Sequence, residues 1–153
     1  MVTAWLVIAI DQLTKFLAIE NLEPAVAKPV FGDLLKLVLV YNDSAAFSIG
    51  FGFTWIFAII STIAMLAILW FAPKIETLGW SIAGGLALGG VVGNLIDRLT
   101  RPPGFGQGQV VDFISIPFNF PIFNLADSFL VIGIGLAMIR TLKGDEVGGG
   151  RHE

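Results

Sequence analysis

Two long stretches of this chain carry no charged residue, and they constrain the fold more than any other feature. They cover positions 51–72 and 78–96, and each is close to the ~20 apolar residues that an α-helix needs to cross a bilayer. Hydrophobic residues make up 56% of the 153 residues and charged residues 14%, whereas soluble domains carry about 25% charged residues. The sequence therefore predicts an integral membrane protein.

Two further segments are apolar enough to span a membrane although they contain ionisable residues. Asp11 and Lys15 interrupt the first segment, and Asp127 lies near the start of the last. A secretory signal peptide begins with a basic region, which the first segment lacks, so we expect this segment to be retained as a helix. The sequence predicts one mainly α-helical membrane domain over 1–153, with spans at about 2–20, 51–72, 78–97 and 122–140.

The two long loops between the spans combine turn and strand signals. Residues 21–50 contain prolines and a glycine before a β-prone run at 37–41, and residues 98–121 place a Gly- and Pro-rich turn before a β-prone run at 110–116. With four spans, both loops lie on one side of the membrane, and both termini lie on the other. Basic residues are divided evenly between the two sides, so the positive-inside rule does not orient the chain.

Composition excludes several classes of function. The net charge is −3 and the basic residues are scattered, so we expect no nucleic-acid partner. The absence of cysteine excludes disulfides, thiolate metal sites and cysteine nucleophiles. The single histidine, His152, lies in a Gly-rich tail and is interpreted as part of a solvated chain end. Histidine-based catalysis is therefore not expected, nor is a metal or another cofactor.

Asp112 and Asp127 are the strongest candidates for chemistry, because each lies in strongly apolar sequence. An ionisable group at the centre of a spanning helix costs roughly 2.5–3.5 kcal/mol, so such a residue usually has a partner or a function. Two acids held close together cannot both ionise easily, which is the electrostatic basis of an aspartic-protease pair. The sequence alone does not prove that these two acids meet.

Other polar residues occur at helical spacing. Asp11 precedes Lys15 by four residues, the favourable order for an ion pair within a helix, and Gln12 adds an amide beside it. Asn94 and Arg98 are one turn apart at the end of the third span and share a face. Taken alone, the first group is interpreted as a membrane-buried salt bridge, and the second as either an interfacial cap or a functional pair.

Small residues mark two further positions. Gly85, Gly89 and Gly93 recur every four residues, so they line one helix face on which a neighbouring helix can approach closely. Asn42 is followed by small residues just before the second span, as a tight turn requires.

Taken together, these motifs resemble the ordered set of the lipoprotein signal peptidase family, signal peptidase II. The motifs are Asp11-Gln12 with Lys15, Asn42 with Ala45-Ala46-Phe47-Ser48, Gly89-Gly90 with Gly93-Asn94 and Asp97-Arg98, Val110-Val111-Asp112-Phe113, and Phe123-Asn124-Leu125-Ala126-Asp127. The resemblance covers residues 11–128. The chain departs from the family at Ser44, where glycine is usual, and in the loop 101–109, which is longer and richer in Gly and Pro.

The resemblance implies an aspartic endopeptidase of the bacterial plasma membrane, with cytoplasmic termini and tail (141–153) and an active site near the outer face. The enzyme would remove the signal peptide from prolipoproteins whose cysteine carries diacylglycerol, cutting on the amino side of that cysteine. The loops 21–50 and 98–121 would be extracytoplasmic and form a small β-rich cradle. Lipid-modified prolipoproteins and membrane lipids are the expected partners of a monomeric enzyme.

By the same resemblance, Asp112 and Asp127 form the catalytic pair, supported by Asp11, Asn42, Asn94, Arg98 and Asn124. Chemically, one ionised aspartate would take a proton from water while its protonated partner polarises the scissile carbonyl. Three alternatives remain open. They are a small transporter that relays protons through buried acids, a structural subunit without chemistry, and a peptidase using Lys15 with one of Ser48, Ser115 and Ser128.

Overall fold

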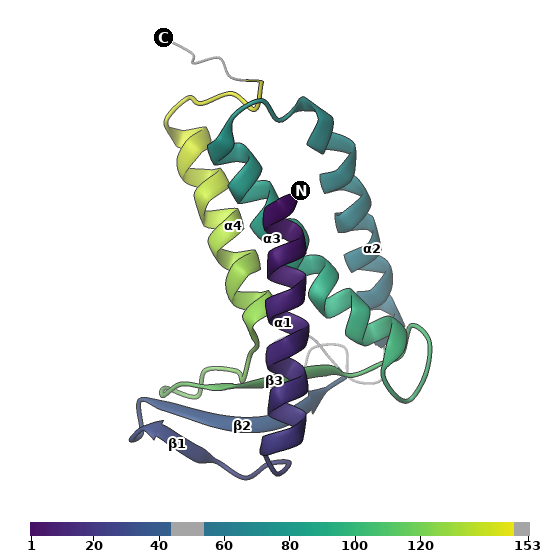
Figure 1. The fold of residues 1–153 in the computed structure, drawn as a ribbon, viewed down its shortest axis with the longest axis vertical. Helices are drawn as coiled ribbons and strands as arrows, with labels where there is room; N and C mark the ends of the chain where they lie inside the picture. Colours follow the sequence, from purple (N-terminus) through teal and green to yellow (C-terminus); the bar gives the residue numbers. More distant parts are fainter. Residues whose placement is uncertain (44–53, 149–153) are drawn as a thin grey trace.

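Four long helices stand over a small sheet in the computed structural model, which describes residues 1–43 and 54–148 (Figure 1). The helices are α1 (Val2–Asn21), α2 (Thr54–Phe71), α3 (Leu78–Thr100) and α4 (Leu125–Leu142). Each is long and apolar enough to cross a membrane. The predicted class, a mainly α-helical membrane protein with four spans and a small β-rich element, is confirmed.

Several helix bounds differ from the predicted spans, and polar contacts explain the two largest differences. The third helix was predicted to end at 97 but continues to Thr100, because the Asp97 carboxylate is not at a solvated helix end but binds the buried Lys15 and the N–H of Val111. The fourth was predicted to begin at 122 but begins at Leu125, because the side chain of Asn124 caps the helix there.

The other two helices differ less from the predicted spans. The first helix ends at Asn21 instead of 20. The second was predicted over 51–72, of which 51–53 lie outside the described residues. It gives way after Phe71 to a short 3₁₀ turn, η2 (Ala72–Lys74), that contains Pro73, a residue that cannot donate the next helical hydrogen bond.

The sheet has three antiparallel strands in the order β1 (Lys28–Phe31), β2 (Leu35–Asn42) and β3 (Val110–Ser115). A small apolar core joins the last turns of α1 to this sheet. Its fully packed members are Ala18, Leu39, Val111 and Phe113. The sheet therefore lies against one end of the helices. We call this the sheet end, and we call the opposite end, where α2 is linked to α3, the far end.

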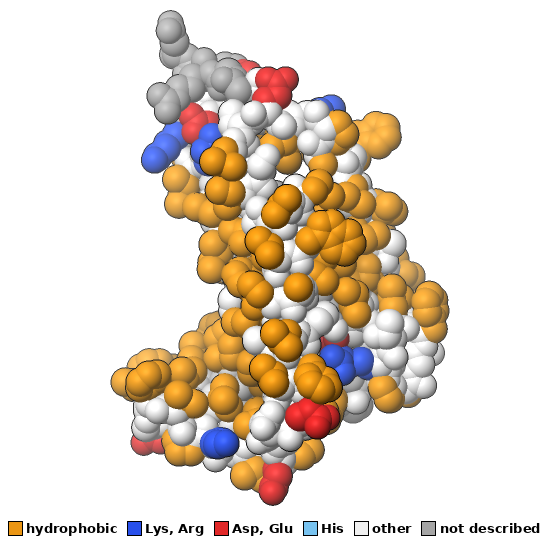
Figure 2. All heavy atoms as spheres, viewed as in Figure 1, with side chains coloured by type: hydrophobic (Ala, Val, Ile, Leu, Met, Phe, Trp, Pro, Cys, Tyr) orange, Lys and Arg blue, Asp and Glu red, His pale blue; other side chains and the backbone are white. Residues whose placement is uncertain are grey.

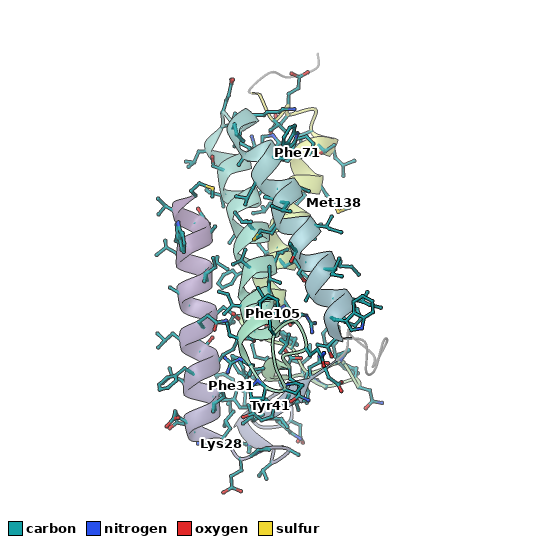
Figure 3. The ribbon with its side chains drawn as sticks, turned by 90° about the vertical axis from the view of Figure 1, so that its right-hand side faces the viewer. Lys28, Phe31, Tyr41, Phe71, Phe105 and Met138 are labelled. Carbon is teal, nitrogen blue, oxygen red and sulfur yellow. The ribbon has the colours of Figure 1, made fainter. Side chains whose placement is uncertain are left out.

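Hydrophobic side chains cover most of the visible face of the helices, whereas charged side chains gather toward both ends (Figure 2). Helix α2 illustrates this, because Thr54 and Ala58 are its buried residues and large side chains such as Trp70 are exposed. Figure 3 shows Phe71 toward the far end and Lys28 and Tyr41 at the sheet end. Such an apolar surface suits a protein surrounded by lipid.

Glycine allows α1 and α3 to approach closely. A Cβ added at Gly89 would lie 2.5 Å from Val7 Cβ, and one at Gly85 would lie 2.6 Å from Thr3 Cβ. At Gly93 the nearest atom would be Asp11 Oδ2, at 2.6 Å. The glycine face predicted from the sequence is thus the face on which α3 packs against α1.

Candidate active site

Strand pairing brings Asp112 and Asn42 together. Asp112 lies on β3 opposite Val40 of β2, and Asn42 follows two residues later on the same face of the strand. The Asn42 Nδ2 atom donates to Asp112 Oδ2 over 2.8 Å. Asp112 is 2% exposed, so its carboxylate is desolvated and depends on such donors.

A bridge between Ile114 of β3 and Phe123 places the start of α4 beside the same strand. The backbone N–H of Ile114 donates to Phe123 O over 2.8 Å, and the N–H of Phe123 donates back to Ile114 O over 3.1 Å. Asn124 is the next residue, and it is fully buried. Its side chain is therefore held against β3 at the position of Asp112.

Asn124 contacts both candidate acids. Its Nδ2 atom donates to Asp112 Oδ1 over 2.6 Å. Its Oδ1 atom accepts from the backbone N–H of Asp127 over 3.0 Å, and its own N–H donates to Asp127 Oδ2 over 3.1 Å. The last two bonds form a capping box at the start of α4. One buried side chain thus joins two acids that come from a strand and from a helix.

Asn94 holds the second oxygen of Asp127. Its Nδ2 atom donates to Asp127 Oδ1 over 2.7 Å, and its Oδ1 atom accepts from Asn124 Nδ2 over 3.0 Å. Asp127 is half-buried and lies in the first turn of α4, where the helix dipole favours a negative charge. The three asparagines together supply donors to four carboxylate oxygens.

Arg98 supplies a positive charge near the two acids. Its side chain is buried and its guanidinium stacks over the ring of Phe57, 5.2 Å from the centroid. Asp112 and Asp127 both attract this cation. The contribution of Phe57 from α2 was not predicted, because no sequence pattern connects a phenylalanine in a lipid-facing helix to a site on another helix.

The electrostatic environment favours the protonated form of Asp112. Burial, together with the neighbouring charge of Asp127, raises the pKa of Asp112 from 3.8 to about 7. The hydrogen bonds from Asn42 and Asn124 act in the opposite direction but do not outweigh burial. One of the two acids is therefore suited to carry a proton at neutral pH, as an acid pair requires.

Asp11 and Lys15 form the predicted ion pair in α1, and the structure adds a second carboxylate. Lys15 Nζ lies 2.9 Å from Asp11 Oδ2 and 2.8 Å from Asp97 Oδ2, and all three side chains are fully buried. The contacts of Nζ with these two carboxylates and with Asn94 Oδ1 argue against a peptidase in which Lys15 would instead contact a serine hydroxyl. Ser128 instead donates to Asn124 O, and Ser48 lies outside the described residues.

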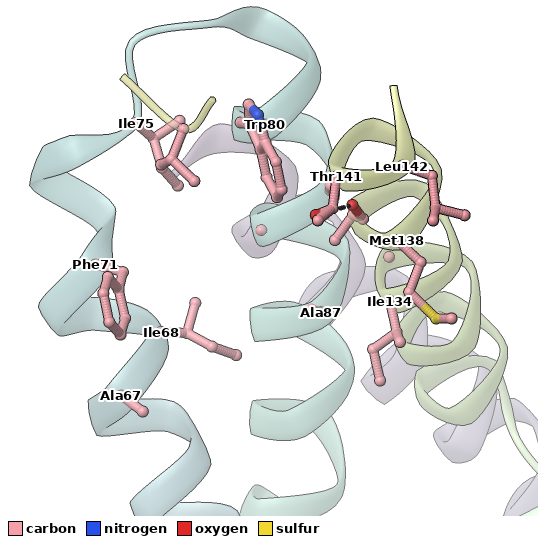
Figure 4. Close-up of a pocket in the computed structure, with 15 residues that line it drawn as sticks. Ala67, Ile68, Phe71, Ile75, Trp80, Ala87, Ile134, Met138, Thr141 and Leu142 are labelled. Carbon is pink, nitrogen blue, oxygen red and sulfur yellow. Dashed lines mark hydrogen bonds between the residues drawn. The ribbon is translucent and has the colours of Figure 1, made fainter. Parts of the chain in front are cut away.

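An apolar cavity of about 640 Å³ lies away from these acids, between α2, α3 and α4 toward the far end (Figure 4). Ile68, Phe71, Trp80, Ile134 and Met138 are among its lining side chains. It offers apolar volume without the acids needed for hydrolysis. We therefore place the candidate active site at the sheet end and not at this cavity.

All seven residues predicted for the site fall within the described part of the chain, and contacts link six of them into one hydrogen-bonded network. Arg98 joins this network through charge. Within the described residues, no group of three or more histidine, aspartate or glutamate side chains is arranged to hold a metal ion. The predicted turn at 44–48 and His152 lie outside the described residues.

The fold and the site define a membrane-embedded protein with a pair of acids linked through asparagine at one end of a four-helix bundle. A model of the family described as signal peptidase II matches residues 3–143. The lipoprotein signal peptidase of Leifsonia xyli subsp. xyli is 47% identical over 99% of this chain and 70% of its own length. That of Rhodococcus jostii is 41% identical over 98% of this chain and 75% of its own.

Solved structures agree with the sequence relatives. A bacterial membrane enzyme determined by the in meso method at 2.3 Å resolution superposes with a TM-score of 0.84 and 32% identity, covering 99% of this chain and 92% of its own. A second, at 1.9 Å resolution, gives a TM-score of 0.81 and 34% identity, covering 93% and 91%. The chain belongs to the signal peptidase II family and is an aspartic peptidase embedded in the membrane.

Proposed function

We propose that this enzyme removes the signal peptide from prolipoproteins, cutting on the amino side of a cysteine that carries diacylglycerol. The observation that carries the proposal is the link from Asp112 through Asn124 to Asp127, at one end of helices that span the membrane. The relatives in Leifsonia xyli and Rhodococcus jostii are lipoprotein signal peptidases by name.

Asp112 and Asp127 are the proposed catalytic pair. Asp112 carries the proton, in keeping with its raised pKa, and Asp127, in the first turn of α4, acts as the base. Water attacks the scissile carbonyl carbon and gives a proton to Asp127, while Asp112 protonates the carbonyl oxygen. The resulting diol collapses when Asp127 protonates the leaving nitrogen and Asp112 recovers its proton from a hydroxyl group. Protons balance, and no covalent intermediate forms.

The supporting residues have distinct proposed roles in this reaction. Asn124 and Asn94 hold the two carboxylates in fixed orientations, and Asn42 donates to the acid that carries the proton. Arg98 limits the repulsion when negative charge develops near the acids. Asp11 on α1 helps to hold the start of α4 in place, because its Oδ1 atom accepts from the backbone N–H of Ala126.

The sheet end is proposed to face the outside of the bacterial plasma membrane, with both termini in the cytoplasm. The acids then lie close to the outer surface, where a secreted lipoprotein emerges. All the site groups come from one chain, so a monomer suffices for the chemistry. The lipid-facing surface of the helices allows a substrate to arrive laterally from the bilayer, and membrane lipids are the natural surroundings.

Diacylglycerol is proposed to be part of the recognition. The described loops form a small sheet, which offers little surface for gripping a peptide, whereas an acyl chain contributes roughly 0.8 kcal/mol per buried methylene. It also fixes the depth of the scissile bond relative to the acids. Lipidation should therefore raise the rate through placement as well as through affinity.

The test compares one prolipoprotein in two forms, with its cysteine lipidated or unmodified, both inserted in the same bilayer with the purified enzyme. We expect cleavage on the amino side of the cysteine, far faster for the lipidated form. The rate should be indifferent to chelators and to serine- or cysteine-directed reagents. Equal rates would show that the peptide alone is recognised, and cleavage of neither form would contradict the proposed function.

A further inference from the structure

Lys15 is an ammonium in the interior of a spanning helix whose three hydrogen-bond donors each meet an acceptor. These acceptors are Asp11 Oδ2 at 2.9 Å, Asp97 Oδ2 at 2.8 Å and Asn94 Oδ1 at 2.9 Å. A lysine ammonium has three donors and no acceptor, so this environment uses its capacity in full. The acceptors come from α1 and α3, and each of them has a second contact that leads toward the catalytic pair.

The contact of Asp11 leads to Asp127. The other oxygen of Asp11, Oδ1, accepts from the backbone N–H of Ala126 over 3.0 Å. Ala126 is fully buried and directly precedes Asp127 in the first turn of α4. A carboxylate in α1 thus holds the backbone that carries one catalytic acid.

Asp97 likewise binds the backbone next to the other catalytic acid, Asp112. Asp97 Oδ2 also accepts from the backbone N–H of Val111 over 3.2 Å. Val111 directly precedes Asp112 on β3 and is fully buried. Each of the two carboxylates bound by Lys15 therefore holds the residue that comes immediately before a catalytic aspartate.

The third contact of Lys15 acts on a side chain. Because the ammonium donates to Asn94 Oδ1, the amide of Asn94 is oriented with its Nδ2 atom toward Asp127 Oδ1, 2.7 Å away. Rotating this amide would bring its NH₂ group against the ammonium and its oxygen against a carboxylate. Lys15 thus selects the one orientation in which Asn94 donates to Asp127.

Charge balance explains how this group can be buried. Asp97 Oδ1 accepts from Arg101 Nε over 2.7 Å, and the Arg101 side chain is 22% exposed, so two carboxylates meet two cations. Even so, a buried ion pair is often no more stable than apolar side chains of similar volume, because desolvation opposes the attraction. Ionisable residues within a membrane are usually retained for a function.

We propose that Lys15 is a positioning residue that sets the geometry of both catalytic acids, through Asp11 and Asp97 on the backbone and through Asn94 on the side chain. The inference rests on the proposed function, because it takes Asp112 and Asp127 as the catalytic pair. Lys15 does not touch the substrate. Its removal therefore changes turnover and leaves substrate affinity largely intact.

The test measures kcat, KM and thermal stability of Lys15→Met and of the double variant Lys15→Met/Asp11→Asn in detergent, with lipidated prolipoprotein as substrate. Lys15→Met leaves buried carboxylates without their cation, so both stability and kcat should fall. The double variant removes one charge of each sign and keeps an oxygen for Ala126. Its Tm should return toward the wild-type value while kcat stays about 100-fold low, the scale expected for misplacement of about 1 Å, with KM little changed.

Three controls separate the possible outcomes. Thr14→Val alters a neighbouring α1 residue whose hydroxyl bonds to carbonyls of its own helix, and it should change neither kcat nor Tm. Wild-type enzyme must cleave the substrate and Asp127→Asn must not, since otherwise the proposed function fails whatever Lys15 does. Recovery of kcat together with Tm in the double variant would show a purely structural role and overturn the inference. Wild-type kcat in a folded Lys15→Met enzyme would also overturn it, and if that variant does not fold, the double variant decides.

Discussion

The α3–α4 pair is apolar along its length, but its two ends differ in where polar groups lie. They are buried at the sheet end and partly exposed at the far end. At the sheet end, Asp97, Asp112 and Asn124 are buried. Asn124 donates to Asp112, and Asp97 accepts from the N–H of Val111, the residue before Asp112. At the far end, the helices and α2 enclose an apolar cavity, and Arg140 pairs with Asp145 at 3.3 Å while partly exposed. Glycines allow close contact along the pair, as at Gly133.

This difference shows that close helix packing does not require the buried polar groups of the candidate active site, because the far end packs without them. The far end encloses apolar side chains, and its charged pair Arg140–Asp145 remains partly exposed. The sheet end buries ionisable groups that would be costly if any partner were missing. Substitutions at the sheet end should therefore reduce activity out of proportion to stability, and substitutions at the far end should affect stability alone.

The largest expected effect in this comparison is a loss of activity on removing one helix cap but not another. Asn124 caps α4 at the sheet end, and Thr77 caps α3 at the far end through a bond from the N–H of Trp80. Asn124→Ala and Thr77→Ala should each destabilise by about 0.5–2 kcal/mol. Only Asn124→Ala should also lower kcat, by about 100-fold or more, because its side chain orients both acids.

Thermal unfolding and cleavage rates of both variants check this expectation. Equal losses of activity in the two variants would mean that Asn124 acts only as a cap. In that case the sheet end would differ from the far end in composition but not in function.

A smaller effect concerns packing and should not depend on the active site. Gly89→Ala places a Cβ 2.5 Å from Val7 Cβ, whereas a Cβ at Gly135 meets nothing within 4 Å. We expect Gly89→Ala to destabilise by about 1–3 kcal/mol through overpacking. Gly135→Ala should be neutral or slightly stabilising, because alanine is the better helix former by about 1 kcal/mol.

Folded yield and Tm in detergent measure the effect, with kcat per folded molecule close to wild type in both variants. If Gly89→Ala unfolds at the same temperature as wild type, α1 and α3 are not closely packed at this position.

The smallest effect is a shift in pH dependence. Under the proposed mechanism Asp112 acts in its protonated form, so kcat/KM should fall as pH rises through about 7, the raised pKa of this group. Asn42 donates to the Asp112 carboxylate and so lowers its pKa. Asn42→Ala should therefore raise the pKa further and move the falling limb to higher pH.

The free energy of unfolding should depend on pH through protonation of the same group, Asp112. The folded protein holds it more tightly than the unfolded chain, whose carboxyl has the ordinary pKa of 3.8. The contribution of Asp112 to stability is thus complete below that pH and is lost as pH rises through about 7. A falling limb that stays in place or moves to lower pH in Asn42→Ala would contradict the assignment of the proton to Asp112.

Much of the fold is predictable from the sequence, because membrane spans depend on local composition. The charge-free runs at 51–72 and 78–96 locate two helices by length alone, and acids in apolar sequence single out Asp112 and Asp127. Helix ends are less predictable. Asn124 lies inside the predicted span 122–140, but its side chain accepts a hydrogen bond from the N–H of Asp127 and caps the helix, so α4 begins at Leu125.

Contacts between distant segments are what the sequence cannot supply. Spacing within a helix predicts that Lys15 meets Asp11, but its bonds to Asp97 and Asn94 depend on how α1 packs against α3. In the same way, Asn42 meets Asp112 only through the register of β2 with β3. The sequence therefore named residues that the fold brings together, but the hydrogen bonds between them depend on how the helices and strands pack.

The most direct measurement of the central claim is single-turnover cleavage of a lipidated prolipoprotein by Asp112→Asn and Asp127→Asn enzymes. Asp33→Asn is the matched control, since Asp33 is an exposed acid paired with Lys36 next to β1. Each catalytic variant should fold like wild type and lose about 10²–10⁴-fold in rate, the usual contribution of general acid–base catalysis, while the control stays fully active. Wild-type cleavage by either purified, folded catalytic variant would contradict the assignment of Asp112 and Asp127 as the catalytic pair.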